Sequence, residues 1–517
     1  MLHEGAEAER YEVRLYAIQA FRNYNMAPRG KRMKKRYLLL SFIICVLGSQ
    51  LKSVNMYYLN MPELVTVIAA GLMAGAAVLF FKKGNGKLFS KILVTGYTLI
   101  FAAVTILGAY CNPYWNSLIY KEAGYTKSGS QELSYREAKK DIDYLMHYLK
   151  KDHPMFLKGV PTDVQEAYDT ALDELKEADT VTVTLIHQKM QNITSVLKDA
   201  HTRAEARYAA LHRLEDLSTR LDSGMELKAV NGTALQELLE QKENLYSFEL
   251  KSREEDSMIS HLGTLEGLNF LGLDPDGIRY TYQTDTGEET ECTYYSDDFV
   301  FKEADEADTS GDEDGISFVS YKVDQEKSLA VLTLNECIYN EEYRNCLKEM
   351  FAEVAASDIR NVAVDLRNNG GGNSSVANEF LHYLDIDSYK GIGARVRYGP
   401  FCPESEPETQ TNRKYQDLLF HGRVFLLTSS KTFSSAMLFA EYIKDNQLGV
   451  IIGEAPGNAP AGYGDIAVFQ APSSGLYFKV STKYFLRADS EAEENVIAPD
   501  ISCVEADAMK VLDENLY

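Results

Sequence analysis

The chain has 517 residues, of which 45% are hydrophobic and 25% charged, and its formal net charge is −23. A chain of this length has room for about three domains, and its acidic surface repels phosphate, so nucleic acid is not expected as a partner. The charge is uneven, because residues 1–111 carry 14 Lys and Arg against 5 Asp and Glu, whereas the remainder carries 39 against 71. This asymmetry indicates a membrane anchor joined to an acidic soluble part.

Three apolar stretches near the N-terminus, at residues 37–51, 64–81 and 89–110, predict transmembrane helices. Basic residues precede the first stretch, and others (82–91) separate the second from the third. Basic loops face the cytoplasm, so residues 112–517 are predicted to lie outside it. We therefore expect a multi-pass protein of the cell membrane that has membrane lipid as a partner.

The first apolar stretch has a second interpretation as a signal peptide, because Lys34, Lys35 and Arg36 precede it. No small-residue cleavage site stands out, so an uncleaved span is expected, and both interpretations leave the large domain outside. Residues 1–36 then form a basic cytoplasmic tail, although Met33 followed by basic residues resembles a start, and translation of residues 1–32 stays open. No pair among the seven cysteines has the spacing of a metal site or a disulfide framework.

Residues 112–204 are predicted to contain a linker and then a helical segment, because apolar residues recur there at intervals of three and four. Residues 205–300 are predicted to be β-rich. Residues 221–232 resemble the strand and turn of a PDZ domain, and residues 279–282 and 291–294 alternate as in a hairpin.

An acidic linker is predicted at residues 301–315, since seven of the twelve residues from Glu303 to Asp314 are acidic. A calcium loop is the alternative, but the carboxylates lack the ordered alternation of such loops. Residues 316–517 alternate strands and helices, including a strand at 329–334 and a helix at 342–356, which predicts an α/β core.

Two motifs in this core indicate a catalytic site. Residues 365–372 read Asp-Leu-Arg-Asn-Asn-Gly-Gly-Gly and follow a short buried strand at 362–364. Successive glycines leave backbone N–H groups bare, and a helix is predicted to begin after them at 374–384, so an anion site is expected there. In the second motif, Ser434 lies between a strand at 424–427 and another predicted helix, where a hydroxyl is exposed beside free N–H groups.

Together with Val-Ile-Ile-Gly-Glu at residues 450–454, these motifs resemble the tail-specific (C-terminal processing) serine peptidase family. Leu-Lys-Asp-Ala-His-Thr at 197–202 resembles the end of that family's N-terminal helical segment. A PDZ-like insertion is common in the family. The resemblance covers residues 130–505 and implies the fold class α/β: a mixed-sheet catalytic core with an N-terminal helical segment and a β-rich PDZ-like insertion, preceded here by transmembrane helices.

The resemblance also implies the catalytic residues. Many members place a lysine about 25 residues after the serine, but residues 456–461 contain none, so the chain resembles the Ser-His-Glu branch that includes the tricorn core peptidase. His201 then acts as the base and Glu493 as the acid. Glu491, Glu494 and Asp489 compete with Glu493 for this role. The backbone N–H groups of Gly371 and Ser435 are predicted to stabilise the oxyanion.

The predicted function is that of a membrane-anchored serine endopeptidase that cleaves polypeptides outside the cytoplasm and requires no metal or organic cofactor. Each residue also has an ordinary structural interpretation, since Ser434 could cap a helix and His201 could lie unreactive at a helix end. The alternative function is a non-catalytic ectodomain that binds a peptide or an apolar ligand. It is favoured by Met437, at which many relatives carry glutamate.

Overall fold

The structure is a computed structural model that describes residues 123–284, 286–303 and 317–516, together with scattered positions between 68 and 118. Within these residues no helix is both long enough and apolar enough to cross a bilayer. The three predicted spans lie almost wholly outside the described residues, and so does most of the predicted acidic linker.

The chain divides into two compact units, Met1–Trp115 and Asn116–Tyr517. Everything below concerns the second unit, which holds all the residues predicted to take part in catalysis.

The core of this unit is a six-stranded sheet with the strand order β19-β16-β15-β10-β9-β8. Its strands are β8 (Val319–Asp324), β9 (Leu329–Leu334), β10 (Asn361–Asp365), β15 (Arg423–Thr428), β16 (Val450–Gly453) and β19 (Ile501–Ser502). Neighbouring strands are parallel except for β8, which runs antiparallel to β9. The sheet is therefore mixed, and the prediction of an α/β core with a mixed sheet is confirmed.

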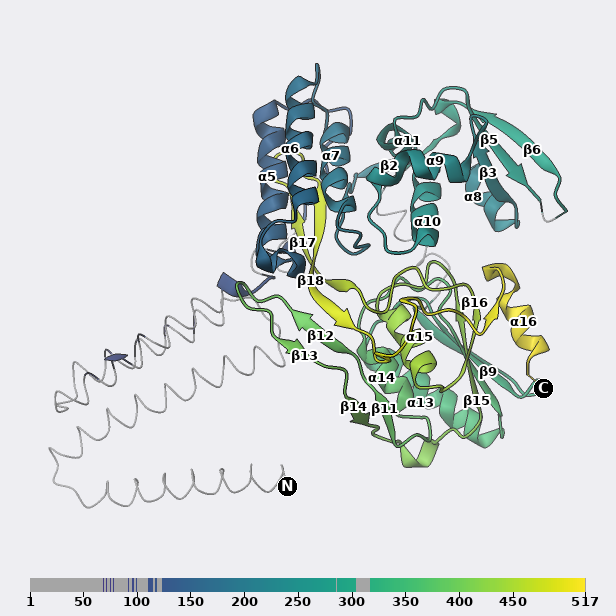
Figure 1. The fold of residues 1–517 in the computed structure, drawn as a ribbon. Coiled ribbons are helices and arrows are strands. Elements are labelled where there is room, and N and C mark those ends of the chain that lie inside the picture. The colour runs from purple at the N-terminus through teal and green to yellow at the C-terminus, as the bar shows by residue number, and fades with distance from the viewer. Residues whose placement is uncertain are drawn as a thin grey trace. The chain divides into compact units, whose positions relative to one another are not determined.

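Helices cover both faces of this sheet because its central strands are apolar on both sides. On one face, Val362 and Val364 pack in a cluster with side chains of α13 (Glu341–Ala356), α14 (Ser375–Leu381) and α15 (Ser435–Asp445). On the other face, Ala363 packs with side chains of α16 (Ala508–Glu514). Figure 1 shows this arrangement of helices around the sheet.

A second sheet joins the N-terminal helices to the C-terminal part of the chain. Its order is β1-β18-β12-β13, and β17 pairs with β18. Its strands are β1 (Ala204–Glu205), β12 (Gly393–Val396), β13 (Glu404–Ser405), β17 (Tyr463–Gln470) and β18 (Tyr477–Leu486). Figure 1 shows β17 and β18 as a long hairpin that runs along the helices.

Those helices are α5 (Tyr135–Asp152), α6 (Thr162–Glu177) and α7 (Val183–Ser195), in the segment for which helices were predicted. The tip of the β17–β18 hairpin is fixed to α5, because the buried carboxylate of Asp141 accepts the backbone N–H groups of Ser473 and Ser474 at 2.8 and 2.7 Å.

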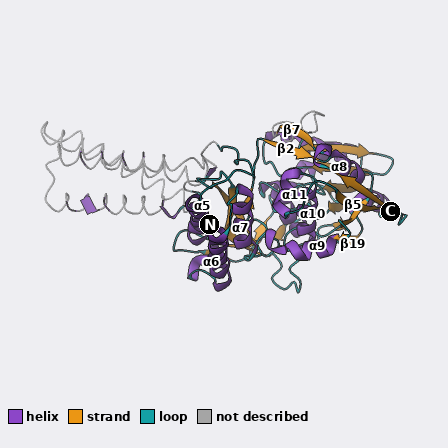
Figure 2. Ribbon diagram, turned by 90° about the horizontal axis from the view of Figure 1, so that it is seen from above, coloured by secondary structure: helices purple, strands orange, loops and turns teal. Residues whose placement is uncertain are grey.

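The segment predicted to be β-rich contains four helices besides its strands. Its four-stranded sheet, of order β4-β3-β5-β6, includes the predicted hairpin, in which Thr281 pairs with Glu291. Four helices share its apolar core. Figure 2 shows these helices in purple and the strands in orange. The strands are β3 (Glu226–Val230), β4 (Thr233–Ala234), β5 (Ile278–Gln283) and β6 (Glu289–Tyr294), and the helices are α8 (Glu215–Asp222), α9 (Leu235–Lys242), α10 (Lys251–Leu262) and α11 (Leu265–Leu271).

The acidic linker was predicted to begin at residue 301, which is too early. Residues 301–303 belong to β7 (Val300–Glu303), which pairs with β2 (Ala210–Arg213) at the start of the same segment. Shorter elements complete the unit: β11 (Ser388–Lys390), β14 (Thr409–Thr411), and the 3₁₀ turns η3 (Pro154–Lys158), η4 (Glu243–Leu245), η5 (Ser296–Asp298), η7 (Gln416–Leu418) and η8 (Glu505–Asp507).

Candidate active site

Both motifs lie at one edge of the core sheet. Strands β10 and β15 are parallel neighbours in which Asp365 pairs with Leu427, so the loops that follow them leave the sheet side by side. Ligand sites in such sheets form at the carboxyl ends of the strands. The loop of glycines that follows β10 and the loop with Ser434 that follows β15 therefore lie next to each other, because their strands are parallel neighbours.

Asn369 joins these loops. Its backbone C=O accepts the N–H of Phe433 at 2.9 Å, and its side chain donates to the C=O of Leu334 at 2.8 Å. Its side-chain oxygen accepts the backbone N–H of Gly371 at 2.9 Å. A fully buried asparagine thus holds the glycine loop against the residue that precedes Ser434.

Ser434 has a backbone conformation that non-glycine residues rarely adopt, with φ 54° and ψ −120°. It stands at the N-terminus of α15, but its side chain makes no capping hydrogen bond. Its backbone N–H donates to Oδ1 of Asn458 at 2.7 Å. The helix-cap explanation of this serine is therefore not supported, and a strained turn that exposes the hydroxyl is the geometry of a nucleophile elbow.

His201 lies in the turn between α7 and β1, where its ring packs on Phe433 with ring centres 4.5 Å apart. The residue is only 7% exposed, and burial lowers the pKa of the imidazole to about 4. The ring is therefore neutral near pH 7, which is the form that accepts a proton.

A cavity of about 370 Å³ brings Ser434 and His201 together. Neither ring nitrogen of His201 has a hydrogen-bond partner among the described residues, so a bond between the base and the nucleophile is not formed in this conformation. Such bonds often tighten only when substrate is bound. The apolar part of the cavity wall consists of Ile392, Met437, Leu438 and Phe485.

Glu441, in the C-terminal half of α15, adds a buried carboxyl group to this cavity. Oε1 of Glu441 accepts the backbone N–H of Ala488 at 2.8 Å, while Oε2 is buried without a partner among the described residues. Burial raises the pKa of Glu441 to about 8. The cavity thus combines an apolar part of its wall with a carboxyl group that is neutral near pH 7.

The predicted oxyanion donors are placed differently. The N–H of Gly371 is already bonded to Asn369, so it is not available in this conformation. Gly372, rather than Gly371, lines the cavity together with Ser435. The backbone N–H groups of Gly372 and Ser435 donate to no described residue, which leaves this pair free to bind an oxyanion.

Glu493, the predicted acid, is not brought to His201. Its side chain is exposed in the segment after β18 and does not line the cavity. The competing residues Glu491 and Glu494 are exposed in the same segment, and Asp489 lies near Lys390 at 3.4 Å.

Two other carboxylates do lie near His201, and the sequence analysis assigned neither a role. Polar side-chain atoms of Asp199, His201 and Glu249 all lie within 4.8 Å of one another. Asp199 was visible in the Asp-x-His-Thr motif, but no local pattern marks Glu249, which lies in the inserted segment.

Lysine is not wholly absent from the site. Lys483 of β18 lines the cavity, where its ammonium group forms an ion pair with Asp465. Lys431, three residues before Ser434, is instead paired with Glu505 at 3.0 Å and does not reach the cavity.

Comparison with known proteins agrees with this fold. Residues 328–503 match peptidase family S41. The structure of mature CPAF complexed with lactacystin resembles this one with a TM-score of 0.52 and 13% identity, over 74% of this chain and 98% of that chain. A crystal structure of mature CPAF resembles this one with a TM-score of 0.52 and 14% identity, over 74% of this chain and 96% of that chain. At these identities the likeness concerns the fold alone. A comparison with curated proteins gave no match.

Proposed function

Because residues 328–503 form a peptidase S41 family domain, the chain is a serine-type peptidase by family, and we propose that it cleaves polypeptides through Ser434 and His201. Ser434 Oγ attacks the scissile carbonyl, and a ring nitrogen of His201 takes the hydroxyl proton and later returns it to the leaving amine. Covalent attack needs no metal or organic cofactor.

The N–H groups of Gly372 and Ser435 stabilise the negative charge on the former carbonyl oxygen. Each such donor is worth roughly 3 kcal/mol of the barrier. The assignment replaces Gly371 by its neighbour, because the N–H of Gly371 is already used by Asn369.

One observation carries the proposal: Ser434 is held in a strained conformation in the wall of the cavity that it shares with His201. A serine that only capped a helix would need neither the strain nor the cavity. Strained backbone persists where the surrounding structure fixes it, and it concentrates at functional sites.

A fluorophosphonate probe tests this activity. We expect the folded protein to be labelled on Ser434, because the probe reacts with a serine activated by a base. Ser434→Ala should abolish labelling, which is read by gel fluorescence. Ser374→Ala is a matched control, since Ser374 also lines the cavity at a helix start.

The variant Ser374→Ala should label as the unmodified protein does. Absence of labelling in a folded protein would contradict the peptidase proposal and would favour the alternative, a peptidase-like ectodomain that binds a peptide or an apolar ligand.

We further propose that the peptidase is held at the cell membrane by the spans predicted at 37–51, 64–81 and 89–110, with its catalytic unit outside the cytoplasm. Support comes from the two basic clusters, one before the first span and one at 82–91, which both belong inside.

Protease added to intact cells or spheroplasts should therefore digest residues 112–517 while a cytoplasmic marker protein stays whole. The measurement is an immunoblot against a C-terminal tag. Protection of the tag until the membrane is opened would contradict this topology.

A further inference from the structure

His201 lacks a partner that would orient its imidazole. Both of its ring nitrogens are buried, and neither makes a hydrogen bond to a described residue. A catalytic histidine needs an acceptor for the N–H that does not face the nucleophile, because that bond holds the ring and stabilises the imidazolium. Two carboxylates, those of Asp199 and Glu249, lie close enough to be considered.

Asp199 is already engaged in fixing the backbone of the site. Its carboxylate accepts the backbone N–H of His201 at 2.9 Å and faces Nε2 of His153 at 3.1 Å. Nδ1 of His153 accepts the N–H of Met155, so Nε2 carries the hydrogen and donates it. Oδ1 of Asp199 is 4.0 Å from Nδ1 of His201, which is too long for a hydrogen bond.

Glu249 has a free carboxylate oxygen, and its carboxylate lies within 4.8 Å of a ring nitrogen of His201, so a hydrogen bond between them requires a small shift when substrate binds. Its Oε2 accepts the backbone N–H of Ala459 at 3.2 Å, while Oε1 is buried without a partner among the described residues. Ala459 follows Asn458, whose side chain accepts the N–H of Ser434. Glu249 is thus hydrogen-bonded to the loop that holds the nucleophile, and its carboxylate lies within 4.8 Å of the base.

The charges around Glu249 explain its protonation. Burial, and secondly the negative charge of Asp199, raise the pKa of Glu249 to about 8, although the N–H groups of Ala459 and Ala200 oppose this shift. The pKa of Asp199 is about 2, because its hydrogen bond with His153 and its electrostatic interactions with His153 and His201 outweigh the effect of burial. The pair therefore carries one negative charge near pH 7.

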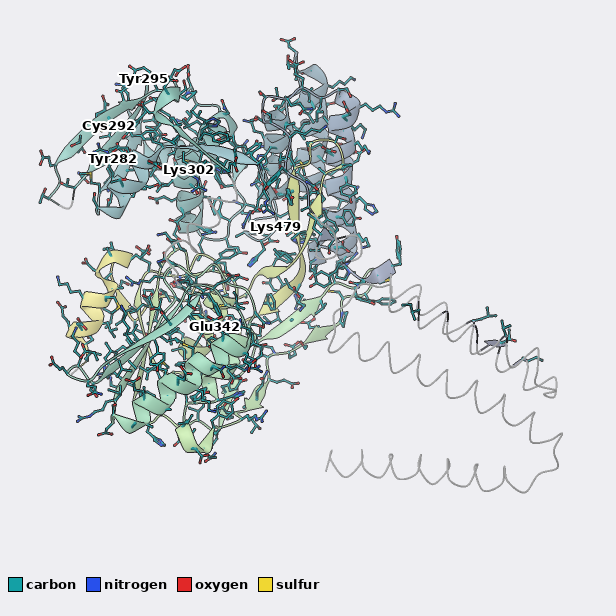
Figure 3. All side chains as sticks on the ribbon, turned by 180° about the vertical axis from the view of Figure 1, so that it is seen from behind. Tyr282, Cys292, Tyr295, Lys302, Glu342 and Lys479 are labelled. Atoms are coloured by element: carbon teal, nitrogen blue, oxygen red, sulfur yellow. The ribbon has the colours of Figure 1, made fainter. Side chains whose placement is uncertain are left out.

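Three cations lie farther out around His201: Arg203 before β1, Arg253 on α10, and Lys479 on β18, which is labelled in Figure 3. Arg203 and Lys479 are both bound to the carboxylate of Glu205, at 2.5 and 2.9 Å. The guanidinium of Arg253 lies over the ring of Phe433. After burial, the positive charges of these three side chains further lower the pKa of His201.

We propose that Glu249, supplied by the inserted segment, is the positioning residue of His201. The inference rests on the proposed peptidase activity. One ring nitrogen takes the proton of Ser434 Oγ, the N–H of the other donates to Oε1 of Glu249, and that second proton stays on the ring. The inserted segment then supplies the third member of the catalytic group, which the family resemblance places at Glu493.

The test is the pH profile of kcat for a fluorogenic peptide between pH 6 and 10. Below pH 8 Glu249 is protonated and can offer only a neutral carbonyl oxygen to the imidazole N–H, whereas above pH 8 its negative charge strengthens that bond and stabilises the imidazolium. The kcat of the unmodified protein should therefore rise about tenfold or more as the pH passes 8. Glu249→Gln should lose this rise and should be roughly 100-fold slower at pH 9, with an unchanged Tm.

Glu255→Gln is the matched control, because Glu255 is an exposed carboxylate on α10. It should keep the rise. Retention of the rise in Glu249→Gln, or its loss in Glu493→Gln instead, would overturn the inference.

A second measurement does not depend on catalysis. In Ser434→Ala protein labelled with ¹³C-histidine, the His201 resonance, assigned with His201→Ala, should shift as Glu249 ionises near pH 8. The shift should vanish when Glu249→Gln is added, and its absence from the Ser434→Ala protein would refute the role of Glu249. The shift in a protein that cleaves no peptide and binds no probe would uphold the positioning while refuting the peptidase proposal.

Discussion

Replacement of His201 by alanine is expected to lower kcat for peptide cleavage by about three to four orders of magnitude while the protein stays folded. The serine hydroxyl is a weak nucleophile near pH 7 unless a base removes its proton, and His201 is a neutral imidazole in the cavity of Ser434. The measurement is kcat on a fluorogenic peptide, with the Tm as a check of folding.

The matched control is Lys483→Ala, which removes a second basic side chain from the same cavity. It should cost far less, because the ammonium of Lys483 is paired with Asp465. Ser434→Ala combined with His201→Ala should be little worse than either change alone, since the two residues act as one unit. If Lys483→Ala abolished turnover while His201→Ala stayed active, a serine–lysine mechanism would replace the one proposed.

Gly371→Ala should disable the site without touching a reacting atom. Gly371 has a φ of 103°, and a Cβ added there would lie 2.7 Å from Cβ of Ser434 and 2.8 Å from the C=O of Phe433. The elbow would have to move, so we expect kcat to fall by about 100-fold or more. The strained φ and the clash together should lower the free energy of unfolding by roughly 3 kcal/mol.

The adjacent residue provides the control for this change. A Cβ added at Gly370 meets no atom within 4 Å, and the residue is exposed. Gly370→Ala should therefore leave both kcat and urea unfolding nearly unchanged. Equal effects at the two positions would show that loop flexibility, rather than close packing against Ser434, is what the glycines provide.

The core of the fold could be predicted because each of its strands is marked by the apolar pattern of its own residues. The strand before the glycines, the strand before Ser434, and their neighbours each carry an apolar pattern that matches the structure within a residue or two. The inserted segment was harder. Its hairpin alternates clearly, but α8 to α11 are short helices whose burial depends on that sheet, so periodicity alone underestimated them.

Site residues could be predicted from the sequence only where a single local motif identifies them. Ser434 and His201 come from motifs, whereas the choice between Gly371 and Gly372 depends on a hydrogen bond to Asn369 that forms only when the loop folds. Glu249 is marked by no sequence pattern, because it comes within 4.8 Å of His201 only when the segment inserted between two catalytic motifs folds against the site.

The route of the chain through the site also bears on when proteolysis can begin. The cavity combines His201 with Ser434 and with residues of β18, and β18 also pairs with β1 next to His201. A growing polypeptide that has not yet produced β18 has neither the cavity wall nor the strand that anchors the turn of the base. We therefore expect the nascent chain to have no proteolytic activity during synthesis. Activity should appear only after β18 has been synthesised and has folded against the rest of the unit.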